Sequence, residues 1–428
     1  MSVDEPMTVD ERRKYLRRMQ HRYQEAGRRQ RSRLLDEMEQ VTRLHRKSLA
    51  RLMSGDLTRR ARRRQRGRSY GPEVRRALGL IARSLDYVCA ERLQPQLVWM
   101  ATHLARHGEL EISPSLLQQL ATISVSTVRR LLKDLPQDEP RLRRRRPPLS
   151  PGLARSIPVR RIPWQEPDPG HFEVDLVHHS GVSASGQYVH TLQMIDVATG
   201  WSERVATLGR SYVVMRDAFR CLEARVPFPI LEVHCDNDSA FLNHHLIRYW
   251  GDRVAPIPLS RSRPYDKNDN RFVEQKNDTL VRAYLGYDRL DTVAQTELLN
   301  HLYEAMRVYY NLFQPVMRLK DKTIVSEAGR PTQVRRRFHP AQTPFDRLAA
   351  LGALQGEAQR RLEALREATS PSRLREGIYA TIDQLFTLPS AKGTETEDVY
   401  QTLFFPVTSQ GHLPARVTLS IERTVATR

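Results

Sequence analysis

Short extended segments rich in apolar residues follow one another from residue 171 onward, and they constrain the fold more than any other feature of the chain. They read HFEVDLVHH (171–179), YVHTLQMIDVATGW (188–201) and SERVATL (202–208). A segment with helical spacing, YVVMRDAFRCLEARV (212–226), precedes a further extended run, ILEVHCDN (230–237). Runs of this length and composition are typical of β-strands. The order predicts an α/β sheet built from three antiparallel strands, a helix and a fourth strand.

Acidic residues occupy positions in this segment where a binding edge is expected. Asp175 lies near the middle of the first strand, and Asp236 ends the fourth. Because open α/β sheets bind ligands at strand ends, the two carboxylates can meet at one edge of the sheet. Glu274 lies in the first turns of a helix predicted within 264–285, which can carry it back toward the aspartates. Three polar residues of the same helix are predicted to contact DNA: Lys276, Asn277 and Arg282.

Three carboxylates are the oxygen ligands that Mg²⁺ prefers, and Mn²⁺ can take its place. Two such ions about 3.5–4 Å apart can activate an attacking oxygen and stabilise the leaving oxygen at phosphorus. We expect Asp175 to bridge both ions, with Asp236 on one ion and Glu274 on the other. The catalytic residues predicted from the sequence are therefore also the metal ligands.

An excess of positive charge indicates what the chain binds. It contains 69 Lys and Arg against 49 Asp and Glu, a formal net charge of +20. A polyanion is the expected partner, and nucleic acid is the common one for chains this basic. The three cysteines have the spacing of neither a zinc site nor a disulfide framework, which favours a reducing compartment. No apolar run reaches the length of a membrane span, so we expect a cytoplasmic protein without a membrane partner.

Two segments ahead of the sheet have the pattern of a helix-turn-helix. The first is RLLDEMEQVTRLHRKSLARLM (33–53). The second is PSLLQQLATISVSTVRRLLKDL (114–135), in which Ser126 is the expected N-cap of the second helix. In this motif the second helix enters the major groove of DNA. The residues predicted to contact DNA are Ser124, Ser126, Thr127, Arg129 and Arg130. The alternative is an ordinary helical hairpin within a bundle.

Arginine runs separate the parts of the chain. The runs at 58–69 and 141–148 hold too few apolar residues to pack, and we expect them to lie along DNA phosphates. The alternative for each is a solvated tail without specific contacts. The first run supplies three predicted DNA-binding residues, Arg62, Arg63 and Arg64. The expected regions are a first helix-turn-helix region with its Arg-rich linker (1–70), a second helical DNA-binding region (71–150), a catalytic domain (165–315) and a basic C-terminal region (316–428).

The C-terminal region is basic and has few long apolar runs. Its stretch DKTIVSEAGRPTQVRRRFHPAQTPFDRL (321–348) is expected to contact the DNA backbone or to form a small β module. Residues 352–376 are predicted to form one charged helix that serves self-association. Residues 377–428 carry no pattern that predicts a role.

Three motifs in a fixed order resemble a known family. HFEVD, HCDNDSAFLN and SRSRPYDKNDNRFVEQKN are similar to the catalytic core of DDE transposases and retroviral-type integrases. The resemblance is strongest to bacterial insertion-sequence transposases, in which TGW (199–201) and VEQKN accompany the acidic triad. It covers residues 165–315. It implies an RNase H-like fold, Mg²⁺-dependent cleavage of the double-stranded DNA ends of a mobile element, strand transfer into target DNA, and a homo-multimer that joins two ends.

Two departures from the family pattern leave alternatives open. Asp238 stands where the family usually has glycine, and Ala240 stands where an acidic residue is common, so Asp238 is the alternative second ligand. The alternative functions are a transposase-derived DNA-binding regulator without catalysis and an RNase H-type nuclease without strand transfer. Four further acids are expected at strand ends or in turns rather than as ligands: Glu173, Asp196, Asp266 and Asp269.

Overall fold

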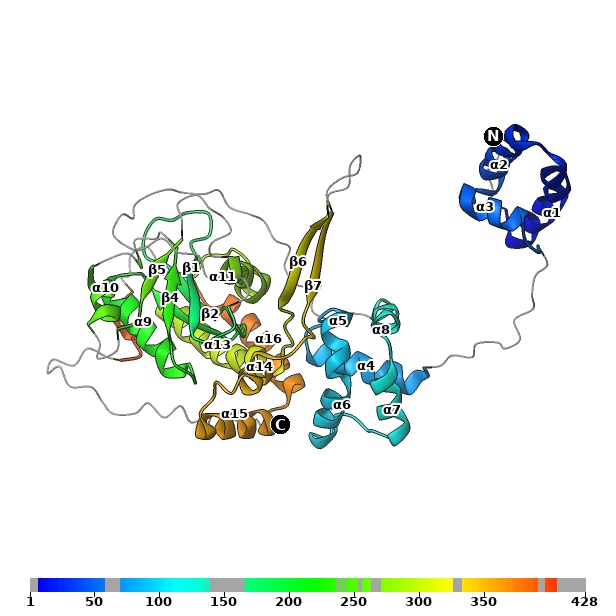
Figure 1. Cartoon of the computed structure of the whole chain (residues 1–428). Helices are drawn as coiled ribbons and strands as arrows, with labels where there is room; N and C mark the ends of the chain where they lie inside the picture. Colours follow the sequence, from blue (N-terminus) through cyan, green and yellow to red (C-terminus); the bar gives the residue numbers. More distant parts are fainter. Residues whose placement is uncertain are drawn as a thin grey trace. The chain divides into compact units, whose positions relative to one another are not determined.

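The computed structural model describes residues 7–57, 70–135, 137–138, 166–236, 240–241, 244–252, 256–262, 271–325, 333–391 and 397–405. The chain divides into two compact units, residues 1–69 and 70–428, and each is described by itself (Figure 1). The finer regional boundaries expected within the second unit remain predictions. Six residues singled out from the sequence lie outside the described residues: Arg62, Arg63, Arg64, Asp238, Asp266 and Asp269.

The first unit contains the helices α1 (Val9–Glu25), α2 (Arg28–Thr42) and α3 (Arg46–Met53). Thr8 and Glu11 start α1 as a capping box, because the side chain of each accepts the backbone N–H of the other. α2 ends at Arg43, whose φ of 55° lies in the left-handed region and turns the chain toward α3. Met38 and Leu49 are fully buried between the helices. The helices predicted within 33–53 are therefore confirmed, and α1 adds a third.

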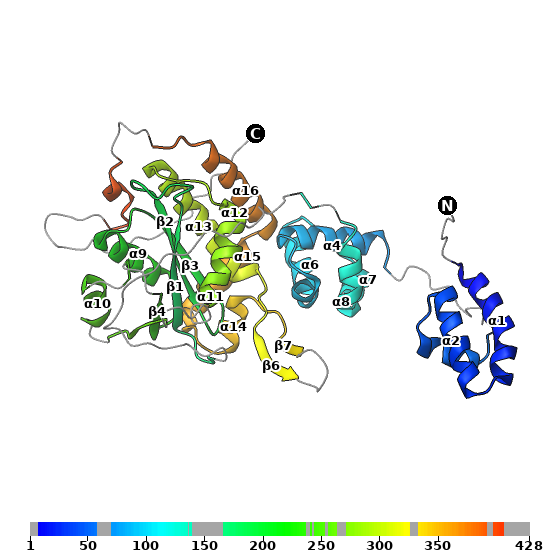
Figure 2. The same cartoon turned by 90° about the horizontal axis from the view of Figure 1, so that it is seen from above.

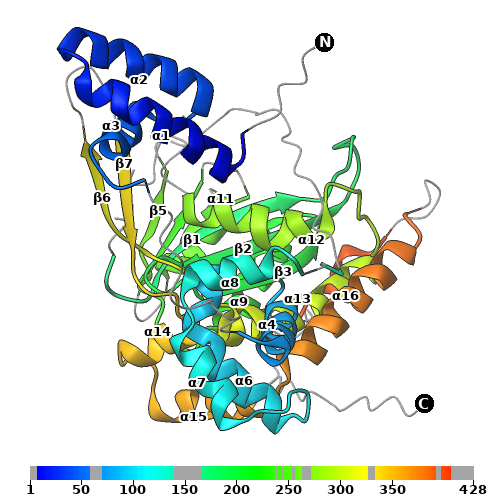
Figure 3. The same cartoon turned by 90° about the vertical axis from the view of Figure 1, so that its right-hand side faces the viewer.

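A bundle of short helices opens the second unit: α4 (Pro72–Ser84), α5 (Ala90–Leu93), the 3-10 helix η1 (Gln94–Gln96), α6 (Leu97–Arg106), α7 (Pro114–Thr122) and α8 (Val125–Leu132). Figure 3 shows α4, α6, α7 and α8 grouped together. α7 and α8 are the helical pair predicted within 114–135. The expected cap was wrong. Ser124, and not Ser126, accepts the backbone N–H of Thr127, because α8 already begins at Val125.

A five-stranded mixed sheet forms the centre of the second unit, with the strands β1 (His171–His178), β2 (Val189–Asp196), β3 (Ser202–Leu208), β4 (Glu232–Cys235) and β5 (Leu259–Arg261). Their spatial order is β3-β2-β1-β4-β5. β1, β2 and β3 pair antiparallel, whereas β4 and β5 continue from β1 as parallel strands. Helix α9 (Tyr212–Arg225) connects β3 to β4. The predicted α/β order is confirmed, while β5 escapes prediction because three residues are too few to show a strand pattern.

Helices cover both faces of this sheet, as Figure 2 shows. Val205 and Ala206 of β3 point to opposite faces because side chains alternate along a strand. Val205 belongs to the core that contains α9, α10 (His244–Gly251) and the last turns of α13 (Val293–Phe313). Ala206 belongs to the core that contains most of the buried apolar residues of α13. On the α13 side, α11 (Arg271–Lys276) contacts β1 and β2 and continues through the π-helical turn η2 (Asn277–Arg282) into α12 (Ala283–Leu285).

The chain after α13 forms a separate ribbon and further helices. β6 (Leu319–Val325) and β7 (Gln333–Phe338) make a two-stranded antiparallel sheet, so the small β module is confirmed. The elements that follow are α14 (Pro344–Ala350), α15 (Gly356–Ala368), α16 (Pro371–Thr387) and the 3-10 helix η3 (Val399–Thr402). The single helix predicted over 352–376 is wrong, because Ser370 caps a new helix and Pro371 cannot continue the previous one. None of the described helices has the length and apolar character needed to cross a membrane.

Candidate active site

Two of the predicted catalytic residues follow paired positions on neighbouring strands. β1 and β4 are parallel, and Val174 of β1 is paired with Cys235 of β4. Asp175 and Asp236 are the next residues along the two strands, so their backbones lie side by side where β4 ends. Both residues are half-buried. The strand register therefore sets the two aspartates at the same place on the sheet.

The third predicted residue lies on a helix that β1 holds in place. Glu173, fully buried on β1, accepts the backbone N–H groups of Phe272 at 2.7 Å and Val273 at 3.0 Å through the single oxygen Oε2. These N–H groups belong to the first turn of α11, where donors have no partner within the helix. A carboxylate also interacts favourably with the positive end of a helix. Glu173 thus ties the start of the helix that carries the exposed Glu274 to a point two residues from Asp175.

The described part of the chain does not gather three acidic side chains into one cluster. Among its residues, no group of three or more His, Cys, Asp or Glu could hold a metal ion. Asp175 accepts the backbone N–H of Leu176 through Oδ1 at 2.8 Å and the side-chain amide of Asn277 through Oδ2. The donor types fit Mg²⁺, since carboxylate oxygens are among its usual ligands. The triad of Asp175, Asp236 and Glu274 therefore remains a prediction.

The turn between β2 and β3 accounts for the TGW motif in structural terms. Asp196 accepts the backbone N–H of Gly170 and both the N–H and hydroxyl of Thr199, at 2.6–2.7 Å. Gly200 has a φ of 82°, which favours glycine, and the buried Trp201 follows it. Burial raises the pKa of Asp196. Asp196 is thus a turn residue, as expected, whereas Glu173 is the anchor of α11.

A buried polar layer lies on the face of the sheet that carries Asp175. Gln193 of β2 is the cross-strand neighbour of both Asp175 and Arg204, and it is fully buried. Arg204 donates to the carbonyl oxygen of Leu280 in η2 at 3.3 Å, and its guanidinium lies 5.5 Å from the ring centre of Tyr303. Burial lowers the pKa of Arg204. The interior beside Asp175 is therefore polar and contains a cationic side chain. Sequence patterns do not reveal this layer, although the spacing of two residues between Glu173 and Asp175 indicates that they share a face.

Three residues predicted to contact DNA from this helix have partners inside the protein. The ammonium of Lys276 contacts the hydroxyl of Tyr310 and lies 4.6 Å from the centre of its ring, and burial holds the pKa of Lys276 well below its usual value. Asn277 donates to Asp175. Arg282 donates to the carbonyl oxygen of His178 at 2.7 Å. In the described structure these side chains support the helix and Asp175, and their contact with DNA remains a prediction.

The other predicted DNA contacts surround the start of α8. Four of them are exposed and Thr127 is half-buried; the exposed residues are Ser124, Ser126, Arg129 and Arg130. Arg129 forms an ion pair with Glu91. The first residues of α8 thus present hydroxyls and guanidiniums at the surface, the side-chain types that bind phosphates and base edges. No contact with DNA follows from exposure alone, so these residues also remain predictions.

Comparison with known proteins places the chain in a family. No family model matches the sequence. A protein of Sinorhizobium fredii described as "Uncharacterized protein y4rM" is 38% identical over 327 residues, which cover 76% of this chain and 91% of that protein. The chain belongs to the family of y4rM. This shared length includes the larger part of the second unit, because the matched residues outnumber those of the first unit several times over.

Solved structures show a weaker likeness to this y4rM-family chain. One match is a chain in the cryo-EM structure of the simian T-cell lymphotropic virus intasome in complex with a PP2A regulatory subunit, with 12% identity, a TM-score of 0.25, and coverage of 44% of this chain and 59% of that chain. Another is the catalytic core domain of BIV integrase, with 15% identity, a TM-score of 0.26, and coverage of 34% of this chain and 85% of that domain. The chain thus spans less than two thirds of the first of these matches.

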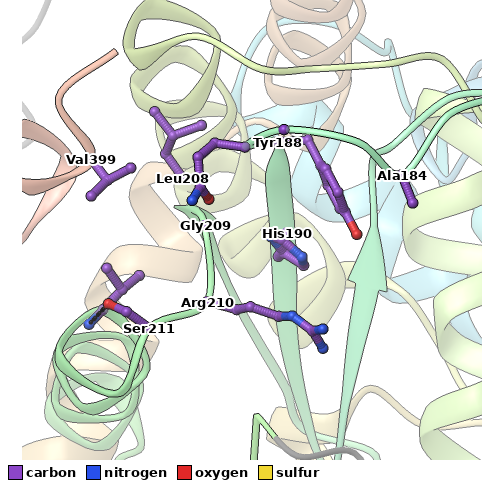
Figure 4. Close-up of a pocket in the computed structure, with 11 residues that line it drawn as sticks. Ala184, Tyr188, His190, Leu208, Gly209, Arg210, Ser211 and Val399 are labelled. Atoms are coloured by element: carbon purple, nitrogen blue, oxygen red, sulfur yellow. Dashed lines mark hydrogen bonds between the residues drawn. The ribbon is translucent and has the colours of Figure 1, made fainter. Parts of the chain in front are cut away.

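The y4rM-family chain also has a cavity of about 450 Å³ that is separate from the predicted acids (Figure 4). Tyr188 and His190, whose rings stack with centres 4.5 Å apart, line it together with Arg210, Ser211 and Val399. Among the described residues that line it, none is a predicted catalytic or DNA-binding residue. The cavity is therefore not the candidate active site.

Proposed function

We propose that the chain is a metal-dependent polynucleotidyl transferase of the DDE type, a transposase that cuts the ends of an insertion sequence and joins them to target DNA. One observation carries the proposal: the β1–β4 register sets Asp175 beside Asp236, while Glu173 fixes the helix of Glu274 to the same strand. The net charge of +20 suits a double-stranded DNA substrate. Because transposition joins two ends, we propose that a homo-multimer is the active form.

In this proposal Asp175, Asp236 and Glu274 hold Mg²⁺, with Mn²⁺ as a substitute. When bound, the metal polarises the reacting phosphate and lowers the pKa of an attacking water or hydroxyl. Asn277 orients the Asp175 carboxylate through its amide, and Glu173 positions α11. Glu274 is exposed, so its side chain can change rotamer without repacking the core.

The test uses the purified full chain, labelled DNA that carries an element end, and Mg²⁺. Asp175→Asn, Asp236→Asn and Glu274→Gln should each abolish cleavage and strand transfer and leave DNA binding largely intact, because a lost ligand does not touch the Arg-rich surfaces. Asp288→Asn, which removes an exposed acid from the turn after α12, is the matched control and should keep full activity. Full activity in any of the three variants contradicts the assigned role.

The same assay separates the alternatives. If Asp236→Asn stays active and Asp238→Asn does not, the second ligand is Asp238. DNA binding without cleavage favours the regulator, and cleavage without joined products favours the nuclease. EDTA should stop the reaction and added Mn²⁺ should restore it.

A further inference from the structure

The β6–β7 ribbon is an isolated element with an exposed surface. Among the described residues, β6 and β7 pair only with each other and with no strand of the central sheet. A two-stranded hairpin is only marginally stable by itself in water. Figure 1 shows the two strands projecting away from the helices and strands around their base. An arm of this kind needs a firm attachment at its base, and its sides remain open to a partner.

The base of the ribbon is held and lies next to the candidate active site. Val316 and Gln342 exchange backbone hydrogen bonds of 2.8 and 3.2 Å across it. His339 donates its backbone N–H to the carbonyl oxygen of Arg318 at 2.9 Å. The guanidinium of Arg318 lies 4.8 Å from the ring centre of Phe272, in the first turn of α11. The arm therefore starts beside the helix that carries Glu274.

The charges of the ribbon suit a partner that surrounds it. Arg335, Arg336 and Arg337 are consecutive on β7 and exposed. Because successive side chains of a strand point to opposite faces, they put positive charge on both faces of the ribbon. Arg335 and Arg337 have Thr323 and Asp321 as their cross-strand neighbours on β6, so one exposed acid lies among them. A ribbon that is basic on both faces matches a groove with phosphates on either side.

The dimensions agree with the major groove of DNA. β7 has 6 residues, which at about 3.4 Å per residue span roughly 20 Å, the length of about six base-pair steps. The major groove, about 12 Å wide, accepts a two-stranded β-ribbon. We propose that the β6–β7 ribbon enters the major groove of the DNA duplex that is presented to Asp175, Asp236 and Glu274. The proposal rests on the proposed function for the identity of the substrate.

A binding experiment in EDTA tests the ribbon without requiring catalysis. The full chain is titrated with a labelled duplex by fluorescence anisotropy at several salt concentrations, and R335Q/R336Q/R337Q is compared with the wild type. The slope of log affinity against log salt should decrease by about 0.9 for each phosphate contact removed. The matched control is R360Q/R361Q/R373Q, which removes the same charge from exposed positions of α15 and α16 and should change the slope much less. Thermal denaturation checks that both variants remain folded.

Dimethyl sulfate protection tests the groove, because it reports on guanine N7 in the major groove. Wild-type protein should protect a patch of about six base pairs, and the ribbon variant should lose this protection. Equal slopes for the ribbon variant and the control overturn the proposal, as does wild-type binding without N7 protection. A changed sedimentation coefficient with unchanged DNA binding would instead make the ribbon a contact between protein chains, which also overturns it. If the wild type binds and protects DNA but does not cleave it with Mg²⁺, the proposed function fails while the ribbon proposal stands.

Discussion

Replacing Glu173 is the most informative perturbation, because this buried side chain connects β1 to the helix that carries Glu274. Its oxygen Oε2 accepts two backbone N–H groups, from Phe272 at 2.7 Å and Val273 at 3.0 Å. Glu173→Ala removes the carboxylate oxygen that accepts both donors, and the small side chain leaves space between the sheet and α11. Glu173→Gln keeps a carbonyl oxygen of similar size in the same place.

The expected cost follows from the number of donors lost. A buried N–H without a partner costs about 1–3 kcal/mol, so two donors set a range of roughly 2–6 kcal/mol. Phe272 is only half-buried, and water can solvate its N–H if the first turn of α11 opens. We therefore expect Glu173→Ala to lower the free energy of unfolding by roughly 2–4 kcal/mol. Glu173→Gln should cost about 1 kcal/mol, the difference between a charged and a neutral acceptor.

Activity should fall further than stability alone explains. A displacement of a catalytic group by about 1 Å can lower a rate roughly a hundredfold. We therefore expect Glu173→Ala to lose about two orders of magnitude in strand transfer under conditions where it is fully folded, and Glu173→Gln to retain most activity. Urea denaturation measures the loss of stability, and the yield of joined DNA products measures the loss of strand transfer.

Glu232 provides the matched control for this prediction. It is also buried, it starts β4 at the end away from Asp236, and it accepts the hydroxyl of Ser260 at 2.6 Å. Glu232→Ala should lower the free energy of unfolding by a similar amount but keep strand transfer per folded molecule. The reasoning is refuted if Glu173→Ala transfers strands at the wild-type rate, or if Glu232→Ala loses as much activity as Glu173→Ala.

Three further predictions concern pH, helix capping and the first arginine run. Burial raises the pKa of Glu203 from 4.5 to about 7, so the folded state holds a proton that the unfolded state releases between these values. The free energy of unfolding should therefore fall as the pH rises through this window, by at most roughly 3 kcal/mol. In urea denaturation, Glu203→Gln should show a weaker dependence on pH than the wild type. Equal pH profiles for the two proteins would contradict a raised pKa of Glu203. Because Ser124 caps α8, Ser124→Ala should destabilise the fold by about 1 kcal/mol and Ser126→Ala by much less. Thermal denaturation measures both losses, and a larger loss for Ser126→Ala would count against this cap. Replacing Arg62, Arg63 and Arg64 by Gln should weaken binding to DNA of any sequence and reduce its salt dependence, and an unchanged salt slope would argue against phosphate contacts there.

Local patterns in the sequence were sufficient for most of the elements. The extended apolar-rich runs in 171–179 and 188–201 mark β1 and β2, and the helical spacing in 212–226 marks α9. Short or interrupted elements were predicted incompletely or not at all. β5 has only three residues, too few to show a strand pattern. The helix predicted within 264–285 contains the π-helical turn η2, and the helix expected over 352–376 breaks at Pro371.

The sequence by itself determined residue types and their order along the chain. These are the acids Asp175, Asp236 and Glu274, the basic runs, and the strand and helix segments. Such features depend on neighbours within a few positions, and periodicity records them directly. The tertiary structure alone decided that Asp175 lies beside Asp236, that Glu173 anchors α11 and that Lys276 turns inward to Tyr310. These relations join residues far apart in the chain, and they depend on strand pairing and core packing, which no local spacing encodes.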